Sequence, residues 1–495
     1  MEFMLPLDSY LEKYPYKYAA LYHALRDAIL NGTLPGGARL PSSRWLAEHY
    51  GLSRGSVAEA YDMLLADGYV LAEVGRGTFV APAASPQPQA DRESSIMLSP
   101  WGRRLMRIKD CIQQDYAPQD TPIPRRKGPK HKDLISLIPQ GMQREHFPHE
   151  EWKSALYAAA REAAEPGVED RAGAAELREG IAAHLRLTRG IRADADTIVL
   201  FSGSMQGIAL LTQLLVAEGE DVVLEQSCYP GIQTAVRACG GNPLPAALDR
   251  DGLIPGGWDS RLLFVTPARQ YPTGAVLSLV RRRELLGWAS RHNAVIIEDD
   301  YDSEFRWGGR PVEPLKALDR EERVVYIGSF SKTMPADFRL GYALVPPALV
   351  GPLLEAKQLY DPLPPGLLEQ RALARFMARG GYARHLRRMT RLYGARHDHF
   401  RASMSRHASG LFELEPGDAG LHVYARWKQD PAQYASFLEA VAAHGVILRD
   451  MAAYHLVPSP PSVSFGFAHL DEERLEEGAR RLAAAWRSLH LFRDE

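Results

Sequence analysis

The sequence is poor in cysteine, in long apolar runs and in net charge, and each shortage narrows what the chain can be. Only three cysteines occur in 495 residues, and the spacing of Cys111, Cys228 and Cys239 fits neither a disulfide framework nor a zinc site. No run of eighteen apolar residues is present, so no membrane-spanning helix is predicted. The formal net charge is −2, so any contact with nucleic acid must come from local basic patches.

The first residues, MEFMLPLDSYLEKY, lack a basic segment followed by an apolar one, so no secretory signal is predicted. With so few cysteines, this favours the cytoplasm. Apolar content of 45% and charged content of 24% are ordinary for a globular protein. A chain of this length exceeds one core, and we expect two or more domains.

Residues 1–80 carry helical periodicity broken by turn residues. Leu21, Leu25 and Ile29 recur every four residues and predict a helix that Gly32 ends. The next segment predicts a short helix and then a longer one. In the longer helix we expect four apolar residues to be buried, namely Val57, Tyr61, Leu64 and Leu65.

Capping residues and a hairpin complete the pattern of this region. Ser42 or Ser43 can cap the short helix and Ser53 the longer one. The stretch VLAEVGRGTFVA predicts a two-stranded wing around Gly75-Arg76-Gly77. Helix, short helix, tight turn, helix and wing is the order of a winged helix-turn-helix, in which the last helix enters the major groove by its N-terminus.

The residues predicted to contact DNA are polar residues at helix starts and in the wing: Arg39, Ser43, Arg44, Ser53, Arg54, Ser56 and Arg76. A small helical domain with surface arginines is the alternative interpretation, because residues 1–80 hold seven basic against nine acidic residues. Residues 81–132 are rich in Pro, Ala and Ser near their start and carry ten basic against five acidic residues. They predict a basic linker, either a solvated tether or an additional contact to DNA phosphates.

Residues 133–495 alternate apolar, strand-like runs with helical stretches. The runs are TIVLFSG, DVVLEQ, LLFVTP, AVIIEDD, RVVYIGS and GYALVP. This alternation predicts a largely parallel sheet covered by helices on both faces, with ligands bound at the carboxyl ends of the strands.

Chemistry-bearing residues gather at those strand ends. LFSGSMQG places Gly203 and Ser204 at a helix start, which is an anion site. Asp299 and Tyr301 end one strand, and GSFSK places Lys332 after another. A phosphate cradle, a carboxylate, a phenol and an amine are the groups that hold pyridoxal phosphate.

Two family resemblances are carried by long stretches of sequence. Residues 18–80, from LYHALRDAILNG to GRGTFV, resemble the GntR-type winged helix of bacterial repressors. Stretches such as TPARQYPTG, IIEDDYDSEFR and GSFSKT, spread over about residues 130–490, resemble fold-type I aminotransferases. The whole chain therefore resembles the MocR/GabR group of transcriptional regulators.

The resemblance implies roles for particular residues. Lys332 would form the Schiff base with pyridoxal phosphate, Asp299 would pair with the ring nitrogen, Tyr301 would bond the ring hydroxyl, and Tyr229 would stack on the ring. The residues implied to surround the phosphate are Ser204, Met205, Ser329, Ser331 and Arg339. The resemblance also implies a head-to-tail homodimer that binds a double-stranded DNA operator, with no metal and no membrane contact.

The chain departs from the family at its carboxylate-binding positions. Ser464, in SVSFGFAHL, and Gly231 stand where the resemblance places two arginines. Without a guanidinium there, an amino-acid carboxylate lacks its usual partner. Arg269 and Arg449 are the candidates for a relocated cation that binds an effector, with a surface or packing role as the alternative.

We therefore expect a regulator that depends on pyridoxal phosphate and senses either that cofactor itself or a small amine or amino-acid-like effector. The competing hypotheses are a true aminotransferase with an appended DNA-binding module, and a DNA-binding protein whose large domain only dimerises. The missing arginines argue against efficient transamination, so at most residual activity is expected.

Overall fold

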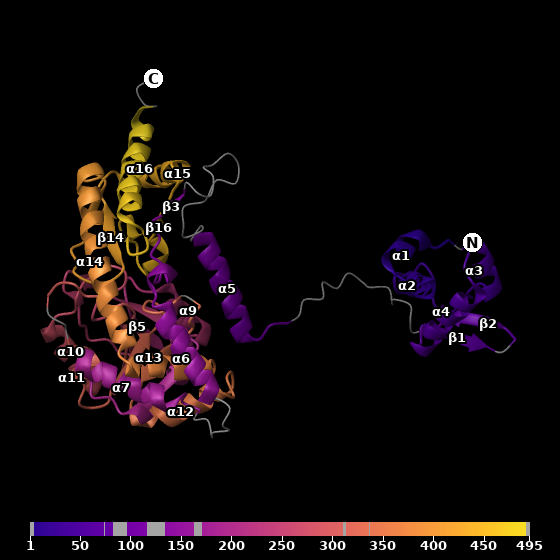
Figure 1. Ribbon diagram of the computed structural model, residues 1–495, viewed down its shortest axis with the longest axis horizontal. Helices are drawn as coiled ribbons and strands as arrows, with labels where there is room; N and C mark the ends of the chain where they lie inside the picture. The colour runs from indigo at the N-terminus through magenta and orange to yellow at the C-terminus, as the bar shows by residue number, and fades with distance from the viewer. Residues whose placement is uncertain are drawn as a thin grey trace. The chain divides into compact units, whose positions relative to one another are not determined.

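The computed structural model describes residues 4–73, 75–82, 97–115, 134–162, 171–309, 313–335 and 337–491. The chain divides into two compact units, Met1–Met97 and Leu98–Glu495, each with its own core (Figure 1). Within the described residues, no helix is long and apolar enough to cross a membrane.

The first unit is a winged helix-turn-helix, as the sequence predicts. Its elements are α1 Leu7–Lys13, α2 Lys17–Leu30, α3 Ser43–His49, α4 Arg54–Ala66, β1 Val70–Glu73 and β2 Gly77–Val80. Ser42 caps α3, because its hydroxyl accepts a hydrogen bond from the Trp45 N–H, and Ser53 caps α4 through the Ser56 N–H. β1 and β2 pair antiparallel and form the wing.

Two details of this unit differ from the sequence prediction. The segment before α2 forms a further helix, α1, which packs against α2 and buries Leu7. Leu65 is 43% exposed instead of buried, while Val57, Ala60 and Leu64 face the core. The buried residues of α4 are therefore spaced three and four residues apart, and Leu65, which directly follows Leu64, falls outside the buried face.

A helix also interrupts the segment predicted to be linker. Within residues 81–132, α5 spans Pro100–Asp115 and packs against α9, Pro230–Cys239, of the large unit. The Arg104 guanidinium donates to the Ala238 carbonyl at 3.0 Å and pairs with Glu218 at 3.1 Å. The linker prediction does not hold for this stretch, because partners more than a hundred residues away stabilise its helix.

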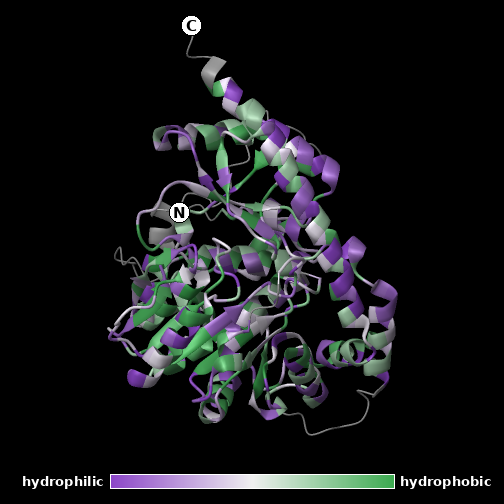
Figure 2. Cartoon of the chain, turned by 90° about the vertical axis from the view of Figure 1, so that its left-hand side faces the viewer, coloured by the Kyte–Doolittle hydropathy of each residue, from purple (hydrophilic) through white to green (hydrophobic). Residues whose placement is uncertain are grey.

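The large unit is built on a central sheet that has seven strands in the described part of the chain, in the order β4-β12-β11-β10-β9-β5-β6. The strands are β4 Ile198–Phe201, β5 Asp221–Glu225, β6 Asn242–Ala246, β9 Leu262–Val265, β10 Val295–Asp300, β11 Val324–Ser329 and β12 Gly341–Leu344. Figure 2 shows green, hydrophobic strands inside a layer of helices of mixed colour. Burial of both faces accounts for the continuous apolar runs in the sequence.

Two strands are exceptions to the parallel pattern. β12 runs antiparallel to both of its neighbours, β11 and β4, which the alternation of strands and helices did not predict. β6 lies at the edge of the sheet and contains Pro243 and Pro245. Proline lacks an N–H donor and is tolerated at an edge, so its presence hid this strand from sequence analysis.

Helices cover the sheet and lead into a smaller sheet near the C-terminus. The helices are α6 His149–Glu162, α7 Ala175–Arg189, α8 Ser204–Leu215, α9, α10 Leu279–Arg291, α11 Leu315–Leu318, α12 Pro347–Gln358, α13 Leu367–Ala378, α14 Gly381–His407, α15 Tyr434–Ala443 and α16 Glu472–Leu491. The smaller sheet has the order β13-β14-β17-β16. Its strands are β13 Phe412–Leu414, β14 His422–Trp427, β16 Arg449–Asp450 and β17 Ser462–Gly466.

Short strand pairs complete the large unit. β3 Ile135–Ser136 pairs in parallel with β15 Val446–Ile447, and β7 Leu248–Asp249 pairs with β8 Gly252–Leu253. One hydrophobic core runs from the central sheet into the smaller sheet and includes side chains from α14 and α16. This shared core holds the smaller sheet at a defined place relative to the strand ends of the central one.

Candidate functional site

Lys332 lies in the turn that follows β11, at the carboxyl edge of the central sheet. Its side chain is mostly buried and makes no hydrogen bond or ion pair with the residues that the structure describes. Burial lowers the pKa of Lys332, Arg449 lowers it further, and Asp302 opposes both. A lysine with a lowered pKa is more often neutral, and the neutral amine is the form that attacks an aldehyde.

Asp299 and Tyr301 come from the neighbouring strand, β10, which runs parallel to β11 with Asp299 opposite Ile327. Burial raises the pKa of Asp299 to about 7, and the nearby carboxylates of Asp300 and Asp302 add to the shift. Within the described chain the Asp299 carboxyl has no hydrogen-bond partner. A positively charged partner placed there would favour its ionised form.

The start of α8 forms an anion cradle beside these residues. Gly203 has φ +106°, and a Cβ built on it would come within 3.1 Å of the Arg339 guanidinium. A Cβ on Gly341 would lie 2.5 Å from the backbone nitrogen of Ser204. The two glycines let a strand, a helix start and an arginine approach one another, and the N–H groups of the first turn of α8 have no partners inside the helix.

Ser329 and Ser331 border the same cradle. Ser329 pairs across the sheet with Gly341, and its hydroxyl donates to the Ser331 hydroxyl at 3.0 Å. The Ser331 N–H in turn donates to the Ser329 hydroxyl at 3.1 Å. The structure therefore brings the predicted phosphate-binding residues of β11 next to the start of α8.

These residues fit pyridoxal phosphate. The cradle suits a dianionic phosphate, the unpartnered Asp299 carboxyl suits a pyridinium nitrogen, and the Lys332 amine suits an aldehyde. Each of the three groups lies at the same edge of the sheet, because β10, β11 and the β4–α8 connection end there.

Tyr229 lies at the start of α9 and is 42% exposed. A Cβ on Gly231 would come within 2.5 Å of the Tyr229 ring and 2.9 Å of the Met205 sulfur. Glycine at position 231 thus leaves the ring and Met205 in place, and an arginine side chain there would displace the ring.

The contacts of Arg269 favour the packing role over the effector-binding role that the sequence also left open. It is 6% exposed, and its guanidinium donates to the Tyr301 hydroxyl at 2.9 Å, to Asp302 at 3.1 Å and to the His422 carbonyl at 2.6 Å. These partners occupy the guanidinium, so we assign Arg269 to holding Tyr301 and Asp302 rather than to binding an effector. Asp302, within DDYDSEF, is a site residue that sequence analysis missed, because a third acid in the motif has no distinguishing spacing.

Arg449 lies in a row of side chains on the smaller sheet. Ser464 on β17 is directly opposite Arg449 on β16 and opposite Tyr424 on β14. Directly opposed residues of antiparallel strands project to the same face, so the three side chains are neighbours. The Arg449 guanidinium also donates to the Tyr454 hydroxyl at 3.3 Å.

Ser464 is fully buried, and its hydroxyl has no hydrogen-bond partner among the residues that the structure describes. Buried hydroxyls without a partner are uncommon and point to a group that completes the bond. Tyr271 and Tyr454 pack beside this row with ring centroids 5.7 Å apart, and the Tyr271 ring also contacts Tyr229 and Tyr301. The sequence indicated Arg449 as a candidate cation. It did not predict that Arg449 lies opposite Ser464, or that Tyr271 and Tyr454 pack beside them.

In the winged helix, the predicted DNA-contacting residues are exposed or half-exposed. Arg54 and Arg44 are exposed at the first turns of α4 and α3, where Ser43 and Ser56 also lie. Ser53 and Ser56 bond each other at 2.9 Å, so their hydroxyls stabilise the helix start.

The wing presents two more predicted arginines. The Arg39 side chain lies against Gly77, whose added Cβ would approach the Arg39 Nε to 3.0 Å. Arg76, at the tip, pairs with Glu73 at 2.8 Å while remaining 76% exposed. An exposed ion pair of this kind contributes little, so Arg76 can exchange Glu73 for a phosphate.

Replacing Asp299 with asparagine should flatten the pH dependence of stability of the cofactor-free protein. Because burial raises the pKa of Asp299, the stability linked to its protonation is complete below about pH 4 and is lost as the pH rises through about 7. At pH 8 the free energy of unfolding of the variant should exceed that of wild type by on the order of 2 kcal/mol. This is less than the free energy equivalent of the whole pKa shift, because the carboxyl is partly exposed to solvent.

Urea unfolding at pH 5, 6, 7 and 8 measures this effect as a difference between the two proteins. The difference is the useful quantity because Glu225 and Glu298 also have pKa values raised by burial to about 7. Parallel stability curves for the variant and wild type would show that Asp299 does not titrate in this range.

Comparisons with known proteins agree with the geometry. The profile described as bacterial regulatory proteins, gntR family, matches residues 17–80, and that of aminotransferase class I and II matches residues 138–482. The probable rhizopine catabolism regulatory protein MocR of Rhizobium meliloti is 33% identical over 95% of this chain and 93% of its own length. The pyridoxine biosynthesis transcriptional regulator PdxR of Corynebacterium glutamicum is 31% identical over 81% of each chain.

Solved structures match the large unit. The kynurenine aminotransferase of Pyrococcus horikoshii aligns with a TM-score of 0.66 and 23% identity, over 80% of this chain and 95% of its own. An archaeal alanine:glyoxylate aminotransferase aligns with a TM-score of 0.67 and 23% identity, over 79% and 96%. At this level of identity, the likeness concerns the fold.

Proposed function

We propose a function from the premise that this chain belongs to the MocR-type transcriptional regulators, in which a GntR-type winged helix precedes an aminotransferase class I and II domain. Pyridoxal phosphate bound at Lys332 makes the large unit a sensor, and the winged helix converts the sensed state into DNA occupancy. The observation that carries this proposal is the meeting of Lys332, Asp299 and the Gly203–Ser204 cradle at one sheet edge.

The bound cofactor would supply an aldehyde carbon that takes up amines and a ring that withdraws electrons. The chain's own residues orient it. Asp299 would pair with the ring nitrogen, the start of α8 with Arg339 would receive the phosphate, and Arg269 holds the Tyr301 hydroxyl. Tyr229 would cover one face of the ring and limit the access of water.

DNA affinity should differ between the cofactor-free and the pyridoxal phosphate-loaded protein. A coupling free energy of about 1–3 kcal/mol is typical of such linked sites, which corresponds to roughly 5- to 150-fold in affinity. Footprinting upstream of the chain's own gene locates the operator, and titration of that duplex with and without the cofactor measures the coupling. An affinity indifferent to the cofactor, together with multiple turnover of amino donors and 2-oxoacids, would favour the aminotransferase alternative instead.

Several features remain part of the proposal. A head-to-tail homodimer that reads two half-sites is what the resemblance to MocR/GabR regulators implies, and the cytoplasm is the compartment in which a DNA-binding protein of this kind acts. Transamination is expected to be negligible, because Ser464 and Gly231 provide no guanidinium for a substrate carboxylate. A regulator needs only a ligand that favours one conformation, and not turnover.

We further assign the effector's anionic group to Arg449 and Ser464. The guanidinium lies across the strand from a buried hydroxyl without a partner, with the Tyr454 hydroxyl at 3.3 Å. These donors suit a carboxylate or a sulfonate. The influence of Arg449 on the pKa of Lys332 supports the proximity of this subsite to the amine end of the ligand.

The assignment predicts a preference for anionic amines that depends on Arg449. β-Alanine, 4-aminobutanoate and taurine serve as probes, with propylamine as the match that lacks an anionic group, and each binding constant is measured from the change in cofactor absorbance. The Arg449→Ala variant should lose roughly 10- to 150-fold in affinity for the anionic probe that wild type prefers, since a hydrogen bond to a charged group contributes about 1.5–3 kcal/mol. Propylamine binding should change little.

A relocated charge provides the control. Adding Ser464→Arg to Arg449→Ala returns a guanidinium to the same face of the sheet, one strand away, and should restore the preference for anions. Equal affinity of wild type for propylamine and for all three anionic probes would contradict the assignment, while leaving the proposed regulator intact.

A further inference from the structure

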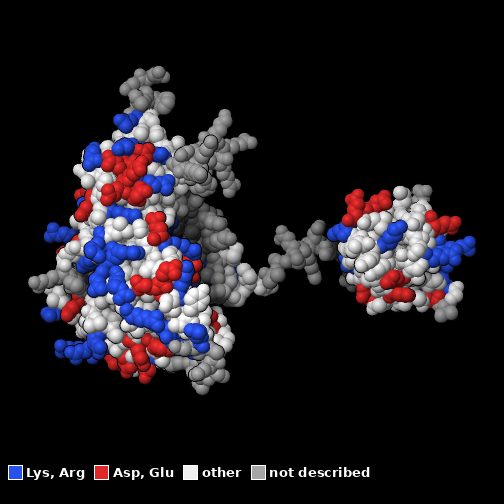
Figure 3. All heavy atoms as spheres, viewed as in Figure 1, with Lys and Arg blue, Asp and Glu red and all other residues white. Residues whose placement is uncertain are grey.

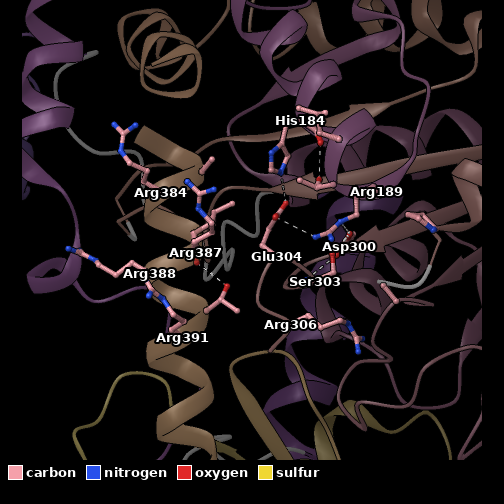
Figure 4. A pocket seen from close by; sticks show the side chains of 17 residues that line it. His184, Arg189, Asp300, Ser303, Glu304, Arg306, Arg384, Arg387, Arg388 and Arg391 are labelled. Carbon is pink, nitrogen blue, oxygen red and sulfur yellow. Dashed lines mark hydrogen bonds and ion pairs between the residues drawn. The ribbon is translucent and has the colours of Figure 1, made fainter. Parts of the chain in front are cut away.

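The large unit carries a cleft of about 990 Å³ on the opposite side of β10 from the cofactor residues. Figure 4 shows arginines of α14 on one wall and Arg189, Asp300 and Glu304 on the facing wall. The cleft is lined by six arginines and two carboxylates, namely Arg189, Arg306, Arg384, Arg387, Arg388, Arg391, Asp300 and Glu304.

The two carboxylates of the cleft share one arginine inside the protein. Arg189 lies 3.6 Å from Asp300 and 3.5 Å from Glu304, and His184 bonds Glu304 at 2.9 Å. Burial alone would raise the pKa of Glu304, but Arg189 and His184 lower it to about 2. Asp300, Glu304 and Arg189 together carry a formal charge of −1, so this floor offsets only part of the charge of the four α14 arginines on the opposite wall.

Three arginines of that wall have no anionic partner among the residues that the structure describes. Arg384 pairs with Glu151 at 2.8 Å and Arg306 with Asp418 at 2.6 Å. Arg387, Arg388 and Arg391 are exposed and make no ion pair or hydrogen bond with any residue that the structure describes. Figure 3 shows Lys and Arg gathered on the face of the large unit where α14 lies.

The spacing of these arginines works against the helix. Arg384, Arg387, Arg388 and Arg391 occupy positions i, i+3, i+4 and i+7 of α14, and like charges three or four residues apart destabilise a helix. The stripe covers about 10 Å along the helix axis. A row of four arginines, of which only Arg384 pairs with a described acid, fits the phosphates of an extended polyanion better than a single small anion.

DNA is the polyanion that this chain binds, and its winged helix is poorly charged for the task. Residues 1–80 hold seven basic against nine acidic residues. Non-specific DNA affinity comes from phosphates neutralised by Lys and Arg, so additional cations must lie elsewhere in the chain. Residues 81–99 can span at most about 65 Å by covalent geometry. This length corresponds to about twenty base pairs of duplex, so the large unit is tethered to the winged helix over a limited length of DNA.

We propose that the arginine stripe of α14 binds the phosphate backbone of DNA that flanks the operator, so that the large unit is a second, sequence-independent DNA contact. The proposal relies on DNA binding by the winged helix but on neither the cofactor nor the effector. An acidic protein surface is the competing occupant, and the experiment separates the two.

The test compares a minimal operator duplex with the same operator extended by about forty base pairs on each side, a length that exceeds the bound set above. The full-length Arg387→Gln/Arg391→Gln variant should match wild type on the minimal duplex. On the extended duplex, its slope of log K against log salt should be shallower by about 0.9 for each lost phosphate contact. Glutamine has a helix propensity close to that of arginine, so α14 is retained.

The matched control is Arg406→Gln/Arg480→Gln, which removes two exposed arginines that are already paired with Glu476. This control should leave both slopes unchanged. An unchanged slope for the Arg387/Arg391 variant on the extended duplex would overturn the proposal. So would equal losses on both duplexes accompanied by a change in mass by sedimentation, since that result assigns the stripe to a protein contact.

Discussion

Replacement of Lys332 with alanine is expected to abolish the visible absorbance of the bound cofactor and the effect of pyridoxal phosphate on DNA affinity. Lys332 supplies the amine that bonds the aldehyde carbon, and its pKa is lowered chiefly by burial. The cradle at Gly203 and the Asp299 carboxyl remain in the variant, so weak, reversible binding of the cofactor should persist. Absorbance spectra after gel filtration, and operator titrations with and without cofactor, measure the two losses.

Lys357 provides a matched control for the removal of a buried lysine. Its side chain is 2% exposed, its pKa is also lowered by burial, and its amine donates to the Arg171 carbonyl rather than facing the site. Lys357→Ala should keep the visible absorbance even where it lowers stability. A Lys332→Ala protein that still retained covalently bound cofactor through gel filtration would refute the assignment of the amine.

The second large effect is expected at the start of the recognition helix. Arg54 is exposed at the first position of α4, and no residue of the described chain pairs with it. An arginine there can bond a guanine edge in the major groove, so Arg54→Ala should cost about 1–3 kcal/mol on the operator and relax discrimination at one base pair. Titration of the operator and of its single-base variants measures both changes.

Substitutions of two other arginines serve as comparisons for the Arg54→Ala result. Arg44→Ala, at the start of α3, should weaken all sequences alike, because a phosphate contact carries no base information. Arg26 pairs with Asp27 at 2.9 Å within α2, and Arg26→Ala should leave DNA affinity unchanged. Full operator affinity in the Arg54→Ala protein would remove the major-groove assignment.

The sequence predicted the elements whose signals are local. Six strands of the central sheet were visible as apolar runs, and the caps Ser42 and Ser53 were visible as hydroxyls before helical periodicity. β6 and α5 were not predicted. The prolines of β6 are tolerated because it lies at a sheet edge, and α5 is stabilised by Arg104 contacts to Glu218 and Ala238, which no local pattern encodes.

Some features of the candidate site could likewise be predicted from the sequence, and others could not. Lys332, Asp299 and Ser204 follow strands that end at one edge, so their convergence could be predicted from the order of strands and helices. The sequence could not decide between the two roles left open for Arg269. Its partners Asp302, Tyr301 and the His422 carbonyl are separated from it by 32 to 153 residues.

The sequence by itself determined that this chain joins a winged helix to an aminotransferase-like domain, because motifs of turn, cap and strand-end residues act over a few positions. Only the tertiary structure decided which groups surround each cation. Strand register places Arg449 opposite the unpartnered hydroxyl of Ser464. Among the residues that the structure describes, Arg387 and Arg391 have no ion-pair partner, whereas Arg189 lies between Asp300 and Glu304. Charge pairing depends on distances of a few ångströms between residues far apart in the chain, and folding alone sets those distances.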